Sequence, residues 1–424
     1  CPARAPVSRA GAVSIGAPTV RQRDDAAIAR DRREESAQFL SMNQPPDSGE
    51  QRFHHLDAAR ALFMLLGIPF HASLVFAGGH WVVMSGSRDP LLAIIPPILS
   101  DFRMPGFFII AGFFAALLLE RRARGDWLKG RAERLGLPFV FGIIAIIPAQ
   151  SAMLARAPAG IIDSAAIVDP ISHLWFLPTL LVLCLMLALV WPLVQHASSL
   201  PMPRVITLGI GIAAYELVLL VATYRLPFEP LLAGGLVDLH ALATFAPFFA
   251  IGVALRRSRR LWERFGRFDP VVTVTGLVAL ALHVWLWEDR SSIGIALDIL
   301  FDGLSSVCLS QTILALLMRS VRKGSAMLDR LVDASLTVYL LHHPVVIALA
   351  IVCIGASLPP LLSWLTICLG AFALPYATHR LLRRSPLALW LVNGVRPHGR
   401  RGLLVRRGGD AGQPAAGDVS PAKP

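Results

Sequence analysis

Long runs of apolar residues recur between Leu56 and Leu382, and they limit the possible fold more than any other feature of the chain. The sequence is 55% hydrophobic and only 16% of its residues are charged, whereas a typical soluble protein carries about 25% charged residues. Segments that are long, apolar and almost free of charge are typical of membrane-spanning helices. We therefore predict an all-α, polytopic integral membrane protein.

We expect about ten transmembrane helices. Several of the apolar runs are shorter than the ~20 residues of a straight span, so tilt, local bilayer thinning or re-entrant flanks are expected. The ten ranges are approximately 56–77, 104–119, 138–155, 174–194, 205–223, 240–255, 270–287, 293–318, 333–353 and 360–382.

Basic residues divide the loops between these spans into two sets. The basic set comprises loops 120–135, 195–204, 256–267 and 319–330, whereas the loops on the other side carry few arginines. The positive-inside rule places the basic loops in the cytoplasm, and an even number of spans places both termini there as well. The same pattern accounts for the net charge of +12, so the lipid bilayer is an expected partner and nucleic acid is not.

The two ends of the chain differ from the apolar middle. Residues 1–51 are polar and lack apolar periodicity, so we expect a disordered leader, with Met42 as a possible true start. Residues 391–424 are expected to form a disordered basic cytoplasmic tail, which leaves 52–390 as the membrane domain. The five cysteines form no CxxC pair and no HExxH occurs, so neither a disulfide framework nor a metal site is expected.

The first span, 56–77, carries ionisable side chains that a plain span does not need. Arg60 and His71 are eleven residues apart, which places them on one helix face, about 16 Å apart along the axis. A neutral imidazole can act as general base for a hydroxyl, and the alternative is a structural hydrogen bond to a neighbouring helix. Arg60 either pairs locally with Asp57 or binds an anion. Pro69 is expected to loosen the helix ahead of His71.

The motif RAER places Arg131 and Arg134 three residues apart, and therefore on one helix face. Two neighbouring guanidinium groups suit phosphate recognition. The alternative is an ordinary positive-inside loop.

Three further motifs supply possible substrate contacts. FRMPGFF places Arg103 at the outer interface, where snorkelling is the structural alternative. HLWFLP places His173 and Trp175 at the entrance of a span, where Trp is usually an interface anchor. YLLHHP contains His342 and His343, which point about 100° apart on a helix. We therefore expect only one of these two histidines to serve a given site.

Several of these motifs occur together in a fixed order. LDAARALFMLLGIPFH, FRMPGFFIIAGFF, RAER, HLWFLP and SLTVYLLHHP follow one another across the predicted spans. In this the chain resembles the membrane acyltransferase-3 family, over residues 52 to about 390. The motifs GIPFHASLV and YLLHHP further resemble those of the branch that succinylates periplasmic glucans.

The resemblance implies roles for individual residues. His71 matches the essential histidine of the first span and Arg60 matches its partner arginine, as catalytic residues. Arg131 and Arg134 match an RxxR pair that engages the acyl donor in the cytoplasm. Apart from the resemblance, Asp57 is a further possible substrate contact, beside Arg103, Trp175 and the histidines His173, His342 and His343.

The resemblance also implies a reaction. An acyl group, succinyl or otherwise acetyl, moves from acyl-CoA to a hydroxyl of a glucan or another carbohydrate outside the bacterial inner membrane. His71 is expected to act as general base, with a covalent acyl-histidine as the alternative. The competing function is a proton-coupled transporter of a small solute, since buried ionisable groups and proline-broken helices suit that class too. The ordered motif set favours the enzyme.

Overall fold

The computed structural model describes residues 53–158, 160–163, 171–196, 203–225, 231–232 and 235–396. The predicted leader, 1–51, and the last residues of the predicted tail, 397–424, lie outside this part of the chain. The helix α17 (Pro386–Asn393) runs past the predicted domain boundary at residue 390. The folded region therefore extends slightly further than the sequence suggests.

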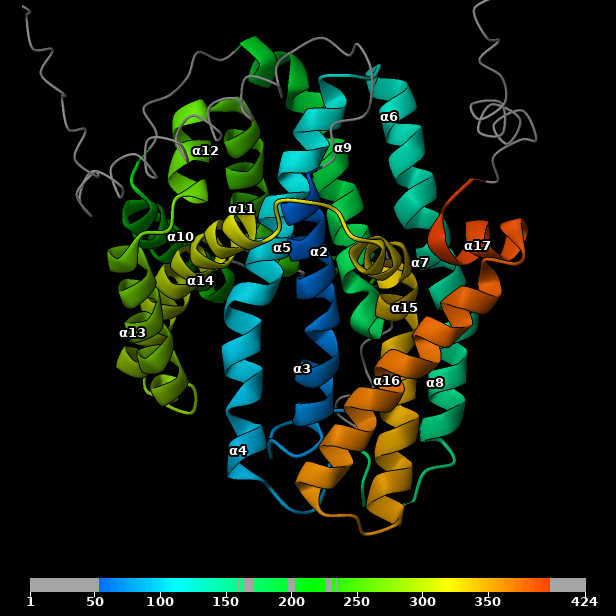
Figure 1. The fold of residues 1–424 in the computed structure, drawn as a ribbon. Helices are drawn as coiled ribbons and strands as arrows, with labels where there is room; N and C mark the ends of the chain where they lie inside the picture. The colour runs from blue at the N-terminus through cyan, green and yellow to red at the C-terminus, as the bar shows by residue number, and fades with distance from the viewer. Residues whose placement is uncertain are drawn as a thin grey trace, which may run out of the picture. The chain divides into compact units, whose positions relative to one another are not determined.

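The described part of the chain is almost entirely helical (Figure 1). Its elements, in order, are α2 (His54–Leu65), α3 (Gly67–Leu74), α4 (Pro90–Ala93), α5 (Ile95–Leu119), α6 (Arg124–Arg131), η1 (Ala132–Gly136), α7 (Leu137–Phe141), η2 (Gly142–Ile146), α8 (Ile147–Leu154), η4 (Ser172–Trp175), α9 (Phe176–His196), α10 (Val205–Arg225), β1 (Leu231–Leu232), β2 (Val237–Asp238), α11 (Leu239–Arg257), α12 (Arg259–Gly266), α13 (Pro270–Leu286), α14 (Ser292–Ser320), α15 (Ala326–Gly355), α16 (Pro360–Leu382) and α17. The two short strands form a single antiparallel pair.

All ten predicted ranges fall on helices, but not all ten are continuous spans. Within the described residues, eight helical stretches are long and apolar enough to cross a membrane, and up to nine if the bent pair α12–α13 is one span. The axes of α12 and α13 differ by 71°. The predicted range 56–77 consists of α2 and α3 with a break between them. The count of ten and the side on which the termini lie therefore stay predictions.

The break between α2 and α3 has a local cause in the sequence. Proline has no N–H to donate to the carbonyl four residues earlier, and for Pro69 that carbonyl belongs to Leu65, the last residue of α2. The carbonyl of Pro69 itself accepts hydrogen bonds from Ser73 Oγ at 2.7 Å and from Trp364 Nε1 of α16 at 3.4 Å. The expected loosening before His71 is thus confirmed, and it falls one turn ahead of Pro69.

The segment predicted as loop 120–135 is helical from Arg124 onward, so that prediction is wrong for most of its length. A helical stretch runs from Arg124 to Leu154 with two π-helical turns, η1 and η2. Pro138 and Pro148 follow these turns by two residues each. Each proline removes one regular backbone hydrogen bond, which favours a widened turn just before it.

Helices α2 and α3 lie between α5 and α15 and contact both (Figure 1). Helix α5 in turn crosses α11 at two glycines. A Cβ atom on Gly112 would lie 2.0 Å from the Phe249 carbonyl oxygen, and one on Gly252 would lie 1.9 Å from that of Ile109. Only hydrogen atoms fit between these backbones, so the glycines set the position of α5 against α11.

Candidate active site

Four histidines from three separate segments meet beside α3. The ring centroid of His71 lies 4.8 Å from that of His343 and 5.3 Å from that of His342. The ring of His173 stacks on His343 at 4.5 Å. The expectation that only one of the two adjacent histidines serves the site is wrong. They approach His71 from different directions, so a separation of about 100° on α15 lets both rings border it.

Backbone carbonyls fix the hydrogen positions on two of these rings. His173 Nε2 lies 3.1 Å from the Leu340 oxygen, and His342 Nδ1 lies 2.6 Å from the Tyr339 oxygen. A carbonyl only accepts, so each of these nitrogens carries the hydrogen and the other ring nitrogen is left as an acceptor. The acceptors, His173 Nδ1 and His342 Nε2, are buried without a hydrogen-bond partner in the described structure, as is His71 Nδ1. The cluster therefore presents several free lone pairs.

Arg103 of α5 lies next to this cluster. Its guanidinium packs over the Phe70 ring at 4.5 Å. A Cβ atom on Gly67 would lie 2.8 Å from Arg103 Nη1 and 3.5 Å from His342 Nε2. The missing side chain at Gly67 is thus the space that lets the arginine approach the histidines. Among the described residues, no carboxylate forms an ion pair with Arg103.

Arg60 lies elsewhere on the same predicted span. It forms an ion pair with Asp57 at 3.3 Å and sits over the Phe114 ring at 5.8 Å. Of the cavities found in the described part of the chain, neither of the two that His71 lines includes Arg60. The structure therefore does not bring Arg60 to His71, because about 16 Å of helix separates them. The cation beside the histidines is Arg103.

Two cavities meet at the histidine cluster. His71, His173 and Trp175 line both of them. The first extends along α2 and α5 and is largely apolar; it is lined by Phe63, Met64, Met104, Phe107 and Phe176, with Arg103 among them. The second, of about 330 Å³, extends past the other end of α3 and is more polar; its lining includes His80, Trp81, Gln150, Ser151 and Ser172. The histidine cluster therefore borders a small apolar cavity of about 40 Å³ on its α2 side and a larger polar cavity beyond the end of α3.

A separate basic cavity of about 560 Å³ surrounds the RAER motif. Arg131 and Arg134 both line it, as their spacing predicted, and Arg134 Nη1 donates a hydrogen bond to the Asn393 oxygen at 2.9 Å. Arg122, Lys129 and Arg396 add positive charge, and an ion pair between Glu133 and Arg396 closes one wall. Arg60 lies near enough for its charge to act on both RAER arginines.

Some residues of the site were not singled out from the sequence. Gly67 and Tyr339 were missed, although each stands in a motif that was noticed. The Tyr339 hydroxyl donates to the His173 oxygen at 2.6 Å and so ties η4 to α15. Its position three residues before His342 was the available signal, because residues three apart share a helix face.

Comparison with known proteins identifies the family of this chain. The profile of the acyltransferase domain family matches residues 53–380. Glucans biosynthesis protein C from Escherichia coli O81 (strain ED1a), from Escherichia coli (strain K12) and from Escherichia coli O139:H28 (strain E24377A / ETEC) is each 27% identical to this chain over 383 residues. The match covers 81% of this chain and 95% of each relative. No solved structure matches the chain. The chain belongs to the acyltransferase-3 family, and it is a multi-pass membrane acyltransferase.

Proposed function

We propose that this acyltransferase moves a succinyl group from succinyl-CoA in the cytoplasm to a hydroxyl of a glucan on the outer side of the bacterial inner membrane. The observation that carries the proposal is that His71 lines two cavities that extend in opposite directions. A catalyst that joins a donor and an acceptor from opposite sides of a membrane needs such a position.

The reaction follows from the chemistry of a neutral imidazole. A ring nitrogen of His71 takes the proton of the acceptor hydroxyl as its oxygen attacks the acyl carbonyl carbon. The carbon–sulfur bond then breaks, and the imidazolium returns the proton to the departing thiolate. The net result is one ester and one free thiol. His71 Nδ1 is buried without a hydrogen-bond partner in the described structure, so it is not already engaged by another side chain.

The basic cavity at Arg131 and Arg134 is proposed to hold the phosphates of CoA. Guanidinium groups bind phosphate through paired hydrogen bonds, and the added charge of Lys129 and Arg122 favours an anion there. Arg60 lies near Arg131 and Arg134 and adds to the positive charge around them. Under this proposal Arg60 therefore helps to bind the donor. The flexible arm of CoA then carries the thioester toward the apolar cavity beside His71.

Arg103 supports succinyl over acetyl as the acyl group. A positive charge beside an apolar cavity is costly unless an anion neutralises it, and no carboxylate pairs with Arg103 in the described structure. The distal carboxylate of a succinyl group would supply that anion, whereas an acetyl group would not. The name of the relatives supports a glucan as the acceptor, and the rings of Trp81 and Trp175 with Gln150 and Ser151 give the second cavity surfaces for a sugar.

The test compares periplasmic glycans from four strains. These are a deletion strain alone and the same strain carrying the wild type, His71→Ala or the matched control His240→Ala, whose side chain is exposed at the start of α11. Mass spectrometry should find the succinyl mass with the wild type and with His240→Ala, and in neither of the other two. Immunoblots of the membranes confirm equal protein levels.

Two results would contradict the proposal. Unchanged glycans in the deletion strain would exclude the glucan as acceptor. A normal acyl content with His71→Ala would exclude His71 as the base. Vesicles supplied with labelled acetyl-CoA or succinyl-CoA then identify the donor, and Arg103→Gln should reduce transfer of succinyl more than transfer of acetyl.

A further inference from the structure

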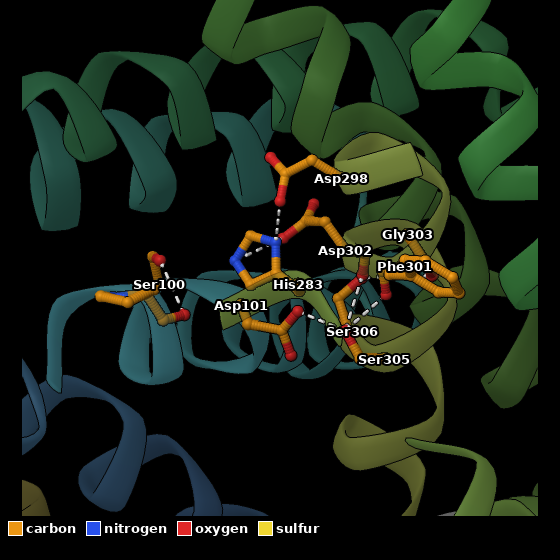
Figure 2. Close-up of polar contacts among 10 residues, drawn as sticks. Ser100, Asp101, His283, Asp298, Phe301, Asp302, Gly303, Ser305 and Ser306 are labelled. Atoms are coloured by element: carbon orange, nitrogen blue, oxygen red, sulfur yellow. Dashed lines mark hydrogen bonds and ion pairs between the residues drawn. The ribbon is translucent and has the colours of Figure 1, made fainter. Parts of the chain in front are cut away.

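A second group of ionisable side chains lies between α5, α13 and α14, apart from the histidine cluster (Figure 2). Asp101, His283 and Asp302 each offer one ligand atom, and these atoms all lie within 4.8 Å of one another. Asp101 is 1% exposed and His283 is 2% exposed. Figure 2 shows the three side chains pointing toward a common centre.

A fourth side chain lies against His283. The Nδ1 of His283 is 2.8 Å from Asp298 Oδ1, an ion-pair distance, although neither atom makes a hydrogen bond of normal geometry in the described structure. The Nε2 of His283 is 3.9 Å from Asp302 Oδ1, which is too long for a hydrogen bond. In metal-binding histidines, the ring nitrogen that does not bind the metal commonly faces a carboxylate.

Four buried side-chain atoms in and beside the cluster have no hydrogen-bond partner of normal geometry in the described structure: Nδ1 and Nε2 of His283, Oδ2 of Asp101 and Oδ1 of Asp298. The Glu216 carboxyl of α10 lies near enough to interact electrostatically with both Asp101 and Asp302. Lone pairs and carboxylates that face one another inside a membrane domain repel unless a cation or a shared proton lies between them.

The atom types suit a small divalent cation. Two ligands that each lie about 2.0 to 2.1 Å from Zn²⁺ are at most about 4.2 Å apart. His283 Nε2 and Asp302 Oδ1 are 3.9 Å apart, and all three ligand atoms lie within 4.8 Å, so the side chains would draw slightly together around an ion. One imidazole with two carboxylates favours Zn²⁺ or Mn²⁺ over Ca²⁺, whose ligands are oxygens. Ser305 Oγ donates to Asp101 Oδ1 and so orients that carboxylate.

We propose that Asp101, His283 and Asp302 bind one divalent transition-metal ion, Zn²⁺ or Mn²⁺, with Asp298 and Ser305 orienting the ligands. The ion ties α5 to the α13–α14 pair. Arg103 stands two residues after Asp101, about 200° around the same helix. The ion therefore holds the face of α5 that carries Asp101, whereas Arg103 lies on the opposite face, toward the histidine cluster.

The experiment measures metal content of the full-length protein purified in detergent. The protein is stripped with a chelator, incubated with Zn²⁺ or Mn²⁺ in parallel, freed of excess metal and analysed by mass spectrometry. We expect about one ion per chain for the wild type, and at least about tenfold weaker binding for His283→Gln and Asp302→Asn. His240→Gln and Asp289→Asn, at exposed positions, serve as matched controls and should bind as the wild type does.

A measurement on the wild type alone guards against variants that fail to fold. X-ray absorption of bound Zn²⁺, or pulsed electron paramagnetic resonance of bound Mn²⁺, should show nitrogen and oxygen ligands with a single imidazole. Two or more imidazoles would place the ion at the four-histidine cluster and overturn the proposal. Failure of the wild type to retain either metal would also overturn it, and the carboxyl groups would then hold a shared proton instead.

Discussion

The substitution Gly67→Ala tests whether the placement of Arg103 matters for acyl transfer. The added Cβ atom would lie 2.8 Å from Arg103 Nη1, whereas carbon and nitrogen atoms in contact are about 3.5 to 4.0 Å apart. The guanidinium must therefore move by about 0.7 to 1.2 Å. It is the far end of a flexible side chain, so it can move without displacing the backbone.

A shift of this size should reduce activity without reducing stability. Misplacing a substrate-orienting group by about 1 Å can cost 100-fold in rate, so we expect kcat/KM to fall about 10- to 100-fold. Alanine in place of glycine within a helix should stabilise the fold by about 0.5 to 1 kcal/mol. The assay measures initial rates of labelled acyl transfer from acyl-CoA by purified protein in lipid vesicles, alongside thermal unfolding.

Gly211→Ala provides the matched control, because Gly211 is also helical and a Cβ atom there would meet nothing within 4 Å. It should leave kcat/KM unchanged. In a double-mutant cycle, Gly67→Ala should add little to the loss already caused by Arg103→Gln, since both act through one group. Wild-type activity for Gly67→Ala, or losses that simply add, would refute a role for Arg103 placement.

Three further substitutions test two other parts of the structure. Arg131→Ala and Arg134→Ala should each raise KM for acyl-CoA about 10- to 100-fold, the value of one charge-assisted hydrogen bond, with a smaller effect on kcat; equal KM values in steady-state kinetics would exclude the basic cavity as the donor site. Gly252→Ala should lower the thermal midpoint and the amount of protein in the membrane, because its Cβ would lie 1.9 Å from the Ile109 oxygen and overpacking costs about 1 to 3 kcal/mol or more. Gly211→Ala again serves as the control, and unfolding of the two variants at the same temperature would contradict the close crossing of α5 and α11.

The sequence by itself determined the features that depend on neighbouring residues. Apolar runs predicted where helices lie, because burial in lipid needs a continuous apolar segment. Pro69 predicted a loosened helix before His71, because proline has no N–H and so removes a hydrogen bond from the adjacent turn. The motifs were also sufficient to predict the acyltransferase family, which the family match over residues 53–380 confirms.

Only the tertiary structure decided which side chains face one another. Helical spacing favoured Arg60 as the partner of His71, but the packing of α5 against α3 brings Arg103 there instead. His173 joins the cluster through η4, more than a hundred residues away along the chain.

The cluster of Asp101, His283 and Asp302 is a clearer case of contacts that the sequence alone does not predict. Its members come from α5, α13 and α14, and no spacing within one helix relates them. Periodicity reports which face of a helix a residue occupies, whereas the choice of neighbouring helix depends on how every side chain packs. The sequence therefore predicted the long apolar helices, and the packing of the helices made the sites.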